Sequence, residues 1–119
     1  MEKASKKPLQ SYFEAIEDPR VERTKQHKLM AIIIIAICGV LCGAEGWVEI
    51  EEFGNVKRDW LGTILDLPNG IPSHDTFGRV FARIDPKQFE NCFLQWVGSL
   101  AEKISGVIAT WWQDLEALT

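Results

Sequence analysis

The run Leu67-Pro68-Asn69-Gly70-Ile71-Pro72-Ser73-His74-Asp75-Thr76-Phe77-Gly78-Arg79-Val80-Phe81 joins a turn to the start of a helix. Pro68 and Gly70 are typical turn residues, and Ser73 is a good helix N-cap. Asp75 falls in the first turn, where a carboxylate suits the positive end of the helix dipole. The run therefore predicts a helix that begins after Ser73 and turns apolar side chains inward.

Recognition helices place polar and basic side chains near their N-terminus, where they reach base edges and phosphates. The predicted helix carries five candidates for DNA contact, namely Ser73, His74, Thr76, Arg79 and Arg83. Apolar spacing over 47–66 predicts a preceding helix, which makes a helix-turn-helix-like pair with a turn longer than the usual three or four residues. An ordinary capped surface helix is the alternative interpretation.

Leu29 to Cys42 is uninterrupted and apolar, with four consecutive isoleucines. The run is too short to cross a bilayer, which takes about 20 residues. It suits a buried helix, and the isoleucines also suit a buried strand. Its length and the flanking Lys25, His27 and Lys28 favour the helix.

The remaining apolar positions also recur at helical spacing. They predict a short helix from Pro8 to Ile16 and a last helix that begins at Asp85-Pro86. The inward stripe of the last helix comprises Phe89, Cys92, Phe93, Trp96, Val97, Leu100 and Ile104. We expect an all-α fold, a single compact bundle of five or six helices over residues 8–109, after a flexible N-terminus at 1–7.

The formal net charge of −4 argues against a chain that binds nucleic acid over its whole surface, although local patches still can. One such cluster lies within 20–28, where Arg23, Lys25 and Lys28 are further candidates for phosphate contact. Nearby Glu17, Asp18 and Glu22 neutralise much of this cluster, so a solvated face is the alternative.

No pattern in the sequence predicts catalysis or a small-molecule substrate. The three cysteines, Cys38, Cys42 and Cys92, suit buried thiols of a reducing cytosol, which predicts a cytoplasmic protein. Their spacing does not predict a zinc site. The acidic positions Glu45, Glu49 and Glu52 share one helix face, which is more typical of a solvated surface than of a metal site.

The order of several motifs resembles the N-terminal region of H-repeat-associated insertion-sequence transposases. The resemblance covers about residues 8–109 and includes Ile16-Glu17-Asp18-Pro19-Arg20, His27-Lys28-Leu29, Gly43-Ala44-Glu45-Gly46-Trp47, Ile50-Glu51-Glu52-Phe53-Gly54 and the run from Leu67 to Phe81. In that family this region is a helical domain that accompanies an RNase-H-like DDE catalytic domain. That catalytic domain uses three carboxylates and divalent metal to cut and join DNA.

The resemblance implies a domain that contacts transposon-end DNA and is not itself an enzyme. It implies no cofactor here, because the divalent metal belongs to the missing catalytic domain. The expected partners are DNA, a second copy of the chain, or intact transposase. An interaction module that packs on the catalytic domain or mediates dimerisation is the competing interpretation, and a remnant without function is a third.

Residues 110–119 depart from the family pattern. The family continues Ile-Asp-Gly-Lys-Thr-Leu-Arg and its first catalytic carboxylate is that aspartate, whereas this chain continues Thr110-Trp111-Trp112-Gln113-Asp114. Codons that encode Trp111 to Thr119 can spell Gly-Gly-Lys-Thr-Leu-Arg-Arg-Ser when read one base later. The sequence therefore predicts an out-of-frame tail, and Asp114 is not expected to be catalytic.

Genomic sequencing tests this frameshift hypothesis. We expect the DNA near codon 110 and beyond to encode the rest of a transposase in the shifted frame, because suitable shifted codons spell nearly the family continuation. A downstream frame that lacks the transposase domain would contradict it.

Overall fold

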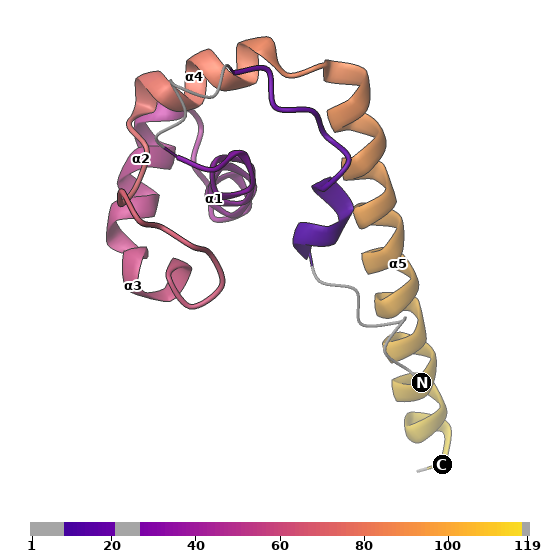
Figure 1. The fold of residues 1–119 in the computed structure, drawn as a ribbon. Helices are drawn as coiled ribbons and strands as arrows, with labels where there is room; N and C mark the ends of the chain where they lie inside the picture. The colour runs from indigo at the N-terminus through magenta and orange to yellow at the C-terminus, as the bar shows by residue number, and fades with distance from the viewer. Residues whose placement is uncertain (1–8, 21–26, 118–119) are drawn as a thin grey trace. The chain divides into compact units, whose positions relative to one another are not determined.

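The computed structural model describes residues 9–20 and 27–117. Within these residues it has one 3-10 helix, five α-helices and no strand, so the predicted all-α class is confirmed (Figure 1). The 3-10 helix is η2 (Leu9–Phe13), and the α-helices are α1 (Leu29–Leu41), α2 (Trp47–Val56), α3 (Arg58–Leu61), α4 (His74–Arg83) and α5 (Pro86–Ala117). The isoleucine run is a helix, and its strand alternative is wrong. The predicted flexible segment 1–7 lies outside the described residues.

The contacts of the chain divide into two compact units, in place of the single bundle that the sequence predicts. One unit contains η2 and α5, and the other, Ile16–Asp85, contains α1 to α4. The reason lies in which helices contact one another, since α5 contacts η2 whereas α2 contacts α1, α3 and α4. No helix in the described part of the chain combines the length and apolar character that crossing a membrane requires.

Helix α1 supplies the core of the Ile16–Asp85 unit. The side chains of residues 32–35, all isoleucines, are 0% exposed. Burying each isoleucine contributes roughly 1.5–3 kcal/mol, which outweighs the modest helix propensity of β-branched residues. The helix ends in a Schellman motif, in which Gly43 takes φ 102° and Ala44 N–H donates to Gly39 O at 2.9 Å. Gly43 therefore turns the chain towards α2.

Helices α2 and α4 pack through aromatic rings. The Trp47 ring stacks on Phe77 at 6.4 Å and on Phe81 at 5.2 Å between centroids. Gly78 permits this approach, because a Cβ at that position would lie 3.3 Å from Trp47 Cδ1. The predicted pair of helices is thus in contact, but α3 and the loop 62–73 separate them along the chain. That connection is much longer than a helix-turn-helix turn.

Aromatic residues also join η2 to the first half of α5. Phe13 is 1% exposed, and its ring lies 5.7 Å from that of Phe89. Phe93 continues the cluster, with its ring centroid 6.1 Å from Phe89 and 5.8 Å from Trp96. The predicted inward stripe is correct to this point.

Beyond Trp96 the apolar side chains of α5 are exposed. Val97, Leu100 and Ile104 were expected to face a core but are exposed, because η2, the other described helix of this unit, has five residues and cannot cover the whole of a 32-residue helix. The helix continues through 110–117, whose origin in a shifted frame stays a prediction.

The buried isoleucines allow a direct test of the α1 core. Ile33→Ala should lower the free energy of unfolding by about 2–5 kcal/mol, because it removes buried methyl groups and leaves a cavity. Val40→Ala is the matched control on the same helix; Val40 is 57% exposed, and its loss should cost less than about 0.5 kcal/mol. Urea unfolding followed by tryptophan fluorescence measures both, and equal effects would contradict the assignment of the core.

Candidate nucleic-acid interface on helix α4

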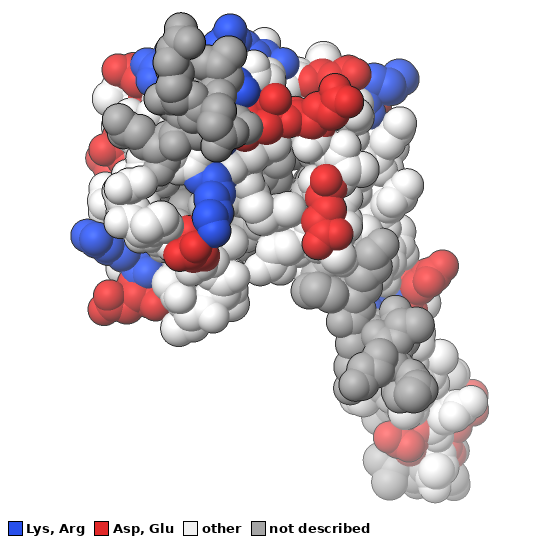
Figure 2. Space-filling model, viewed as in Figure 1, with Lys and Arg blue, Asp and Glu red and all other residues white. Residues whose placement is uncertain are grey.

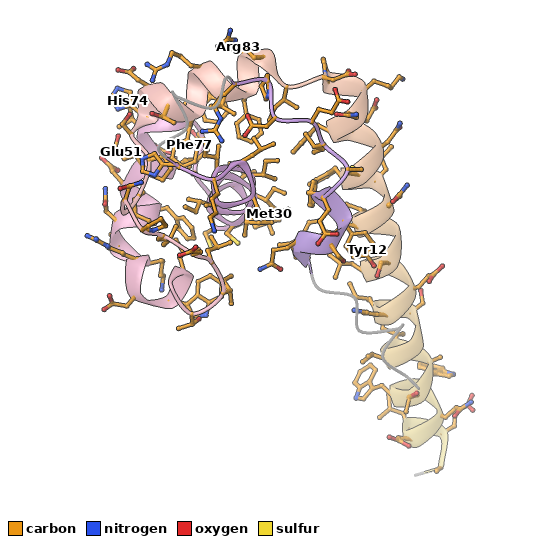
Figure 3. The ribbon with its side chains drawn as sticks, viewed as in Figure 1. Tyr12, Met30, Glu51, His74, Phe77 and Arg83 are labelled. Carbon is orange, nitrogen blue, oxygen red and sulfur yellow. The ribbon has the colours of Figure 1, made fainter. Side chains whose placement is uncertain are left out.

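The N-terminus of α4 is capped by side chains from two helices. Ser73 Oγ accepts a hydrogen bond from Thr76 N–H at 3.3 Å, as the sequence predicts. Glu51 of α2 supplies a second cap that the sequence did not reveal, because its Oε1 accepts from His74 N–H at 2.8 Å. The same oxygen lies 2.8 Å from His74 Nδ1, and Figure 3 shows the two side chains together at one end of α4.

The contact between Glu51 and His74 shifts the pKa of both side chains. The hydrogen bond with Glu51 raises the pKa of His74 above its ordinary value, and the Asp75 and Glu51 charges act in the same direction. The side-chain hydrogen bond with His74, and then that from its backbone N–H, lower the pKa of Glu51. His27 behaves in the opposite way, since burial and the charge of Arg20 lower its pKa.

This cap alters how α4 can meet a phosphate. Free N–H groups at a helix N-terminus attract anions, but the Glu51 carboxylate already occupies that position. Asp75 Oδ1, 3.5 Å from His74 Nε2, adds a further negative charge. The predicted contact residues Ser73, His74 and Thr76 therefore hold the start of the helix in place.

Of the five predicted contact residues on α4, Arg79 and Arg83 are the two that take no part in the cap. Both are exposed, and they lie four residues apart on α4, which places them on the same side of the helix. Neither forms an ion pair with any other residue in the described ranges. Arg83 lies in the last turn, where the helix dipole favours a cation, at the opposite end of α4 from His74 (Figure 3).

Only part of the second predicted cluster, at 20–28, lies within the described residues. Arg23 and Lys25 lie outside the described residues. Lys28 Nζ contacts Asp66 Oδ2 at 2.6 Å, with both side chains exposed. Arg20 binds the Asp18 carboxylate through two nitrogens at 2.9 and 2.8 Å, and its side chain is only 8% exposed. The described cations of this segment other than His27 are thus paired with carboxylates.

Acidic and basic side chains intermingle on the face shown in Figure 2. One of the acids considered as a metal ligand has a structural role, because Glu49 Oε1 accepts from Glu45 N–H at 2.6 Å in front of α2. Over residues 9–20 and 27–117, no three His, Cys, Asp or Glu side chains come together in a way that would hold a metal ion.

Comparison with known proteins places this arrangement in a family. Residues 10–97 match the DDE_Tnp_1-associated family, and the chain belongs to it. An uncharacterised protein encoded in the dhlA 3′ region of Xanthobacter autotrophicus is 52% identical over 86 residues, which are 71% of this chain and 29% of that protein. The H repeat-associated protein YhhI of Escherichia coli (strain K12), whose name assigns it provisionally to the transposases, is 43% identical over 91 residues, 76% of this chain and 24% of YhhI.

A shorter relative matches over almost its full length. The inactive transposase YbfQ of Escherichia coli (strain K12) is 42% identical over 77 residues, which are 65% of this chain and 92% of YbfQ. By contrast, the chain spans about a quarter of the length of the first two relatives. No solved structure matches the chain. The resemblance to H-repeat-associated transposases is therefore confirmed, for a region that is a portion of the longer relatives.

The His74–Glu51 pair predicts a pH dependence of stability. The folded-state pKa of His74 lies above its unfolded value of 6.5, so its contribution is complete below pH 6.5 and is lost as the pH rises through the folded pKa. The folded-state pKa of Glu51 lies below 4.5, so its contribution is present above pH 4.5 and is lost as the pH falls. The pair should stabilise α4 most between these two values.

An NMR titration of the two histidine rings measures this coupling. His74 should titrate above pH 6.5 and His27 below it, for the causes given above. Glu51→Gln should lower the His74 midpoint and flatten the decline of the melting temperature between pH 6 and 8, whereas Glu52→Gln on the next residue should change neither. An unchanged His74 midpoint in Glu51→Gln would show that the pair does not form.

Proposed function

We propose that this chain is the N-terminal region of a DDE-type transposase, that it contacts DNA at the ends of the mobile element, and that it does not catalyse strand transfer by itself. The observation that carries the proposal is membership of the DDE_Tnp_1-associated family together with identity to H repeat-associated relatives. The proposal assigns no catalytic divalent metal and no cofactor to this region, because DDE chemistry places its divalent ions on carboxylates of the catalytic domain.

Arg79 and Arg83 are the proposed phosphate contacts. Both guanidinium groups are exposed, and a planar guanidinium binds phosphate with two parallel hydrogen bonds. Glu51 disfavours a phosphate at the N-terminus of α4, so the middle and last turns of the helix are the better surface. His74 then acts indirectly, by joining α4 to Glu51 of α2, while Ser73 and Thr76 cap the start of α4.

The basic segment 20–28 is a secondary part of the proposal. Lys28 would have to exchange the Asp66 carboxylate for a phosphate, which is feasible because both side chains are exposed. Arg23 and Lys25 would extend the same surface. With a net charge of −4 we expect modest affinity that falls steeply with added salt.

An interaction module is the second candidate, and the far half of α5 favours it. Exposed apolar side chains recur there at steps of three and four residues, namely Val97, Leu100, Ile104 and Val107. This spacing is typical of helices that pair along a seam. On this interpretation α5 packs on the catalytic domain or on a second copy, and Arg79 does not touch DNA.

Fluorescence anisotropy with labelled duplexes distinguishes these functions. The full chain should bind an element-end duplex more tightly than a scrambled one, and binding should weaken with salt. Arg79→Ala and Arg83→Ala should each weaken binding and lower the slope of log K against log salt by about one, because each removes one phosphate contact. Both residues are exposed, so each substitution should change the free energy of unfolding by less than about 0.5 kcal/mol.

Lys103→Ala is the matched control, because it removes one exposed cation from α5 and leaves α4 intact. An equal loss of DNA affinity in this variant would indicate that binding depends on overall charge and not on the α4 surface. Failure of the folded chain to bind either duplex at low salt would reject the DNA role and favour the interaction module.

A further inference from the structure

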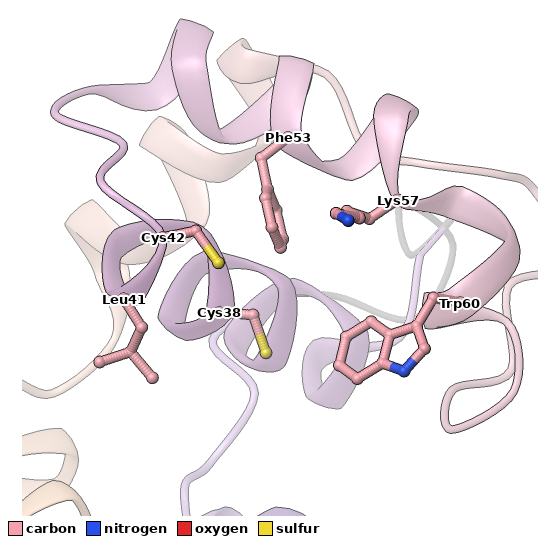
Figure 4. A pocket seen from close by; sticks show the side chains of 6 residues that line it. All are labelled: Cys38, Leu41, Cys42, Phe53, Lys57 and Trp60. Atoms are coloured by element: carbon pink, nitrogen blue, oxygen red, sulfur yellow. The ribbon is translucent and has the colours of Figure 1, made fainter.

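A cavity of about 320 Å³ lies between α1, α2 and α3, away from α4. Its lining consists of Cys38, Leu41, Cys42, Phe53, Lys57 and Trp60. Figure 4 shows the Cys38 sulfur projecting from α1 and the Cys42 sulfur projecting from its C-cap into this space, with the two aromatic rings and the lysine around it. The cavity thus combines two thiols and one ammonium group within a largely apolar wall.

The two thiols stand one helical turn apart. Cys42 N–H donates to Cys38 O at 3.0 Å, so the residues are successive on one face of the helix. Side chains at this spacing have Cβ atoms roughly 5–6 Å apart, which lets both sulfurs approach one ion placed between them.

We propose that Cys38 and Cys42 form a two-coordinate site for a soft monovalent cation, with copper(I) as the best chemical match. Thiolate ligands select copper(I), zinc and iron–sulfur clusters among biological metals. Structural zinc takes four ligands, and the described residues provide no group of three His, Cys, Asp or Glu at this place. Two sulfur ligands suit an ion that accepts two-coordinate binding, such as copper(I).

The charges of the bound state balance within the cavity. Two thiols and one copper(I) ion give an anionic S–Cu–S unit and release two protons to water. The cation removes the repulsion between adjacent thiolates, and the Lys57 ammonium compensates the one remaining negative charge. Phe53, Leu41 and Trp60 form the apolar part of the wall beside the sulfurs, which suits a soft ion better than a hydrated one.

Anaerobic titration of the full chain tests the site. Copper(I) is added in competition with bathocuproine disulfonate, whose coloured complex reports the metal that the protein does not hold. The wild-type chain should withdraw one equivalent. Cys42→Ser should abolish saturable binding and still fold, because Cys42 is exposed and the expectation of a buried thiol is wrong for it. Cys38→Ser should do the same, with circular dichroism to confirm the helices.

Two further variants complete the test. Cys92→Ser removes the buried thiol of α5 and should leave copper binding unchanged. Lys57→Gln should weaken binding roughly ten-fold, in line with the loss of a group that supports the ligands from outside the coordination shell. Undiminished binding in both Cys38→Ser and Cys42→Ser, an equal loss in Cys92→Ser, or the absence of stoichiometric binding by the wild-type chain would overturn the proposal. None of these outcomes depends on the DNA role.

Discussion

Burial of the isoleucine side chains of α1 is the interaction on which the Ile16–Asp85 unit depends. Residues 32–35 are fully enclosed, so this helix needs neighbours on every side. Helix α2 covers one side, and Gly39 allows it to come close, with a Cβ at that position only 3.3 Å from Ile50 Cγ1. Helix α4 in turn packs on α2. The position of the candidate interface therefore follows, through α2, from the apolar run in α1.

The sequence was a good guide where periodicity and local signals agreed. The sequence indicates the bounds of α1 and the starts of α2 and α4. It also indicates the Ser73 cap and the buried face of α4 at Phe77 and Val80, through apolar spacing and turn chemistry. The helix predicted over 47–66 is wrong in its second half, because α2 ends at Val56, which is 80% exposed, and the chain turns into the short helix α3. Periodicity identifies a face without showing whether anything covers its last residue.

Long-range contacts could not be predicted. Glu51 and His74 are 23 residues apart, and nothing near either residue indicates that they meet. Their contact changes the interpretation of the site. The sequence predicts that the N-terminus of α4 can bind an anion, but in the structure this N-terminus already binds the Glu51 carboxylate. The division into two units is of the same kind, because the apolar face of α5 looks alike in sequence on both sides of Trp96, whereas only its first half packs against η2.

The close contact between Gly78 and Trp47 has an evolutionary consequence. A side chain at position 78 would press on the indole, and a smaller residue at position 47 would leave a gap beside the α4 backbone. A methyl group at position 78 would require the indole of Trp47 to shift by a few tenths of an ångström. Exchanges at positions 47 and 78 should therefore depend on each other, because each sets the space that the other can use between α2 and α4.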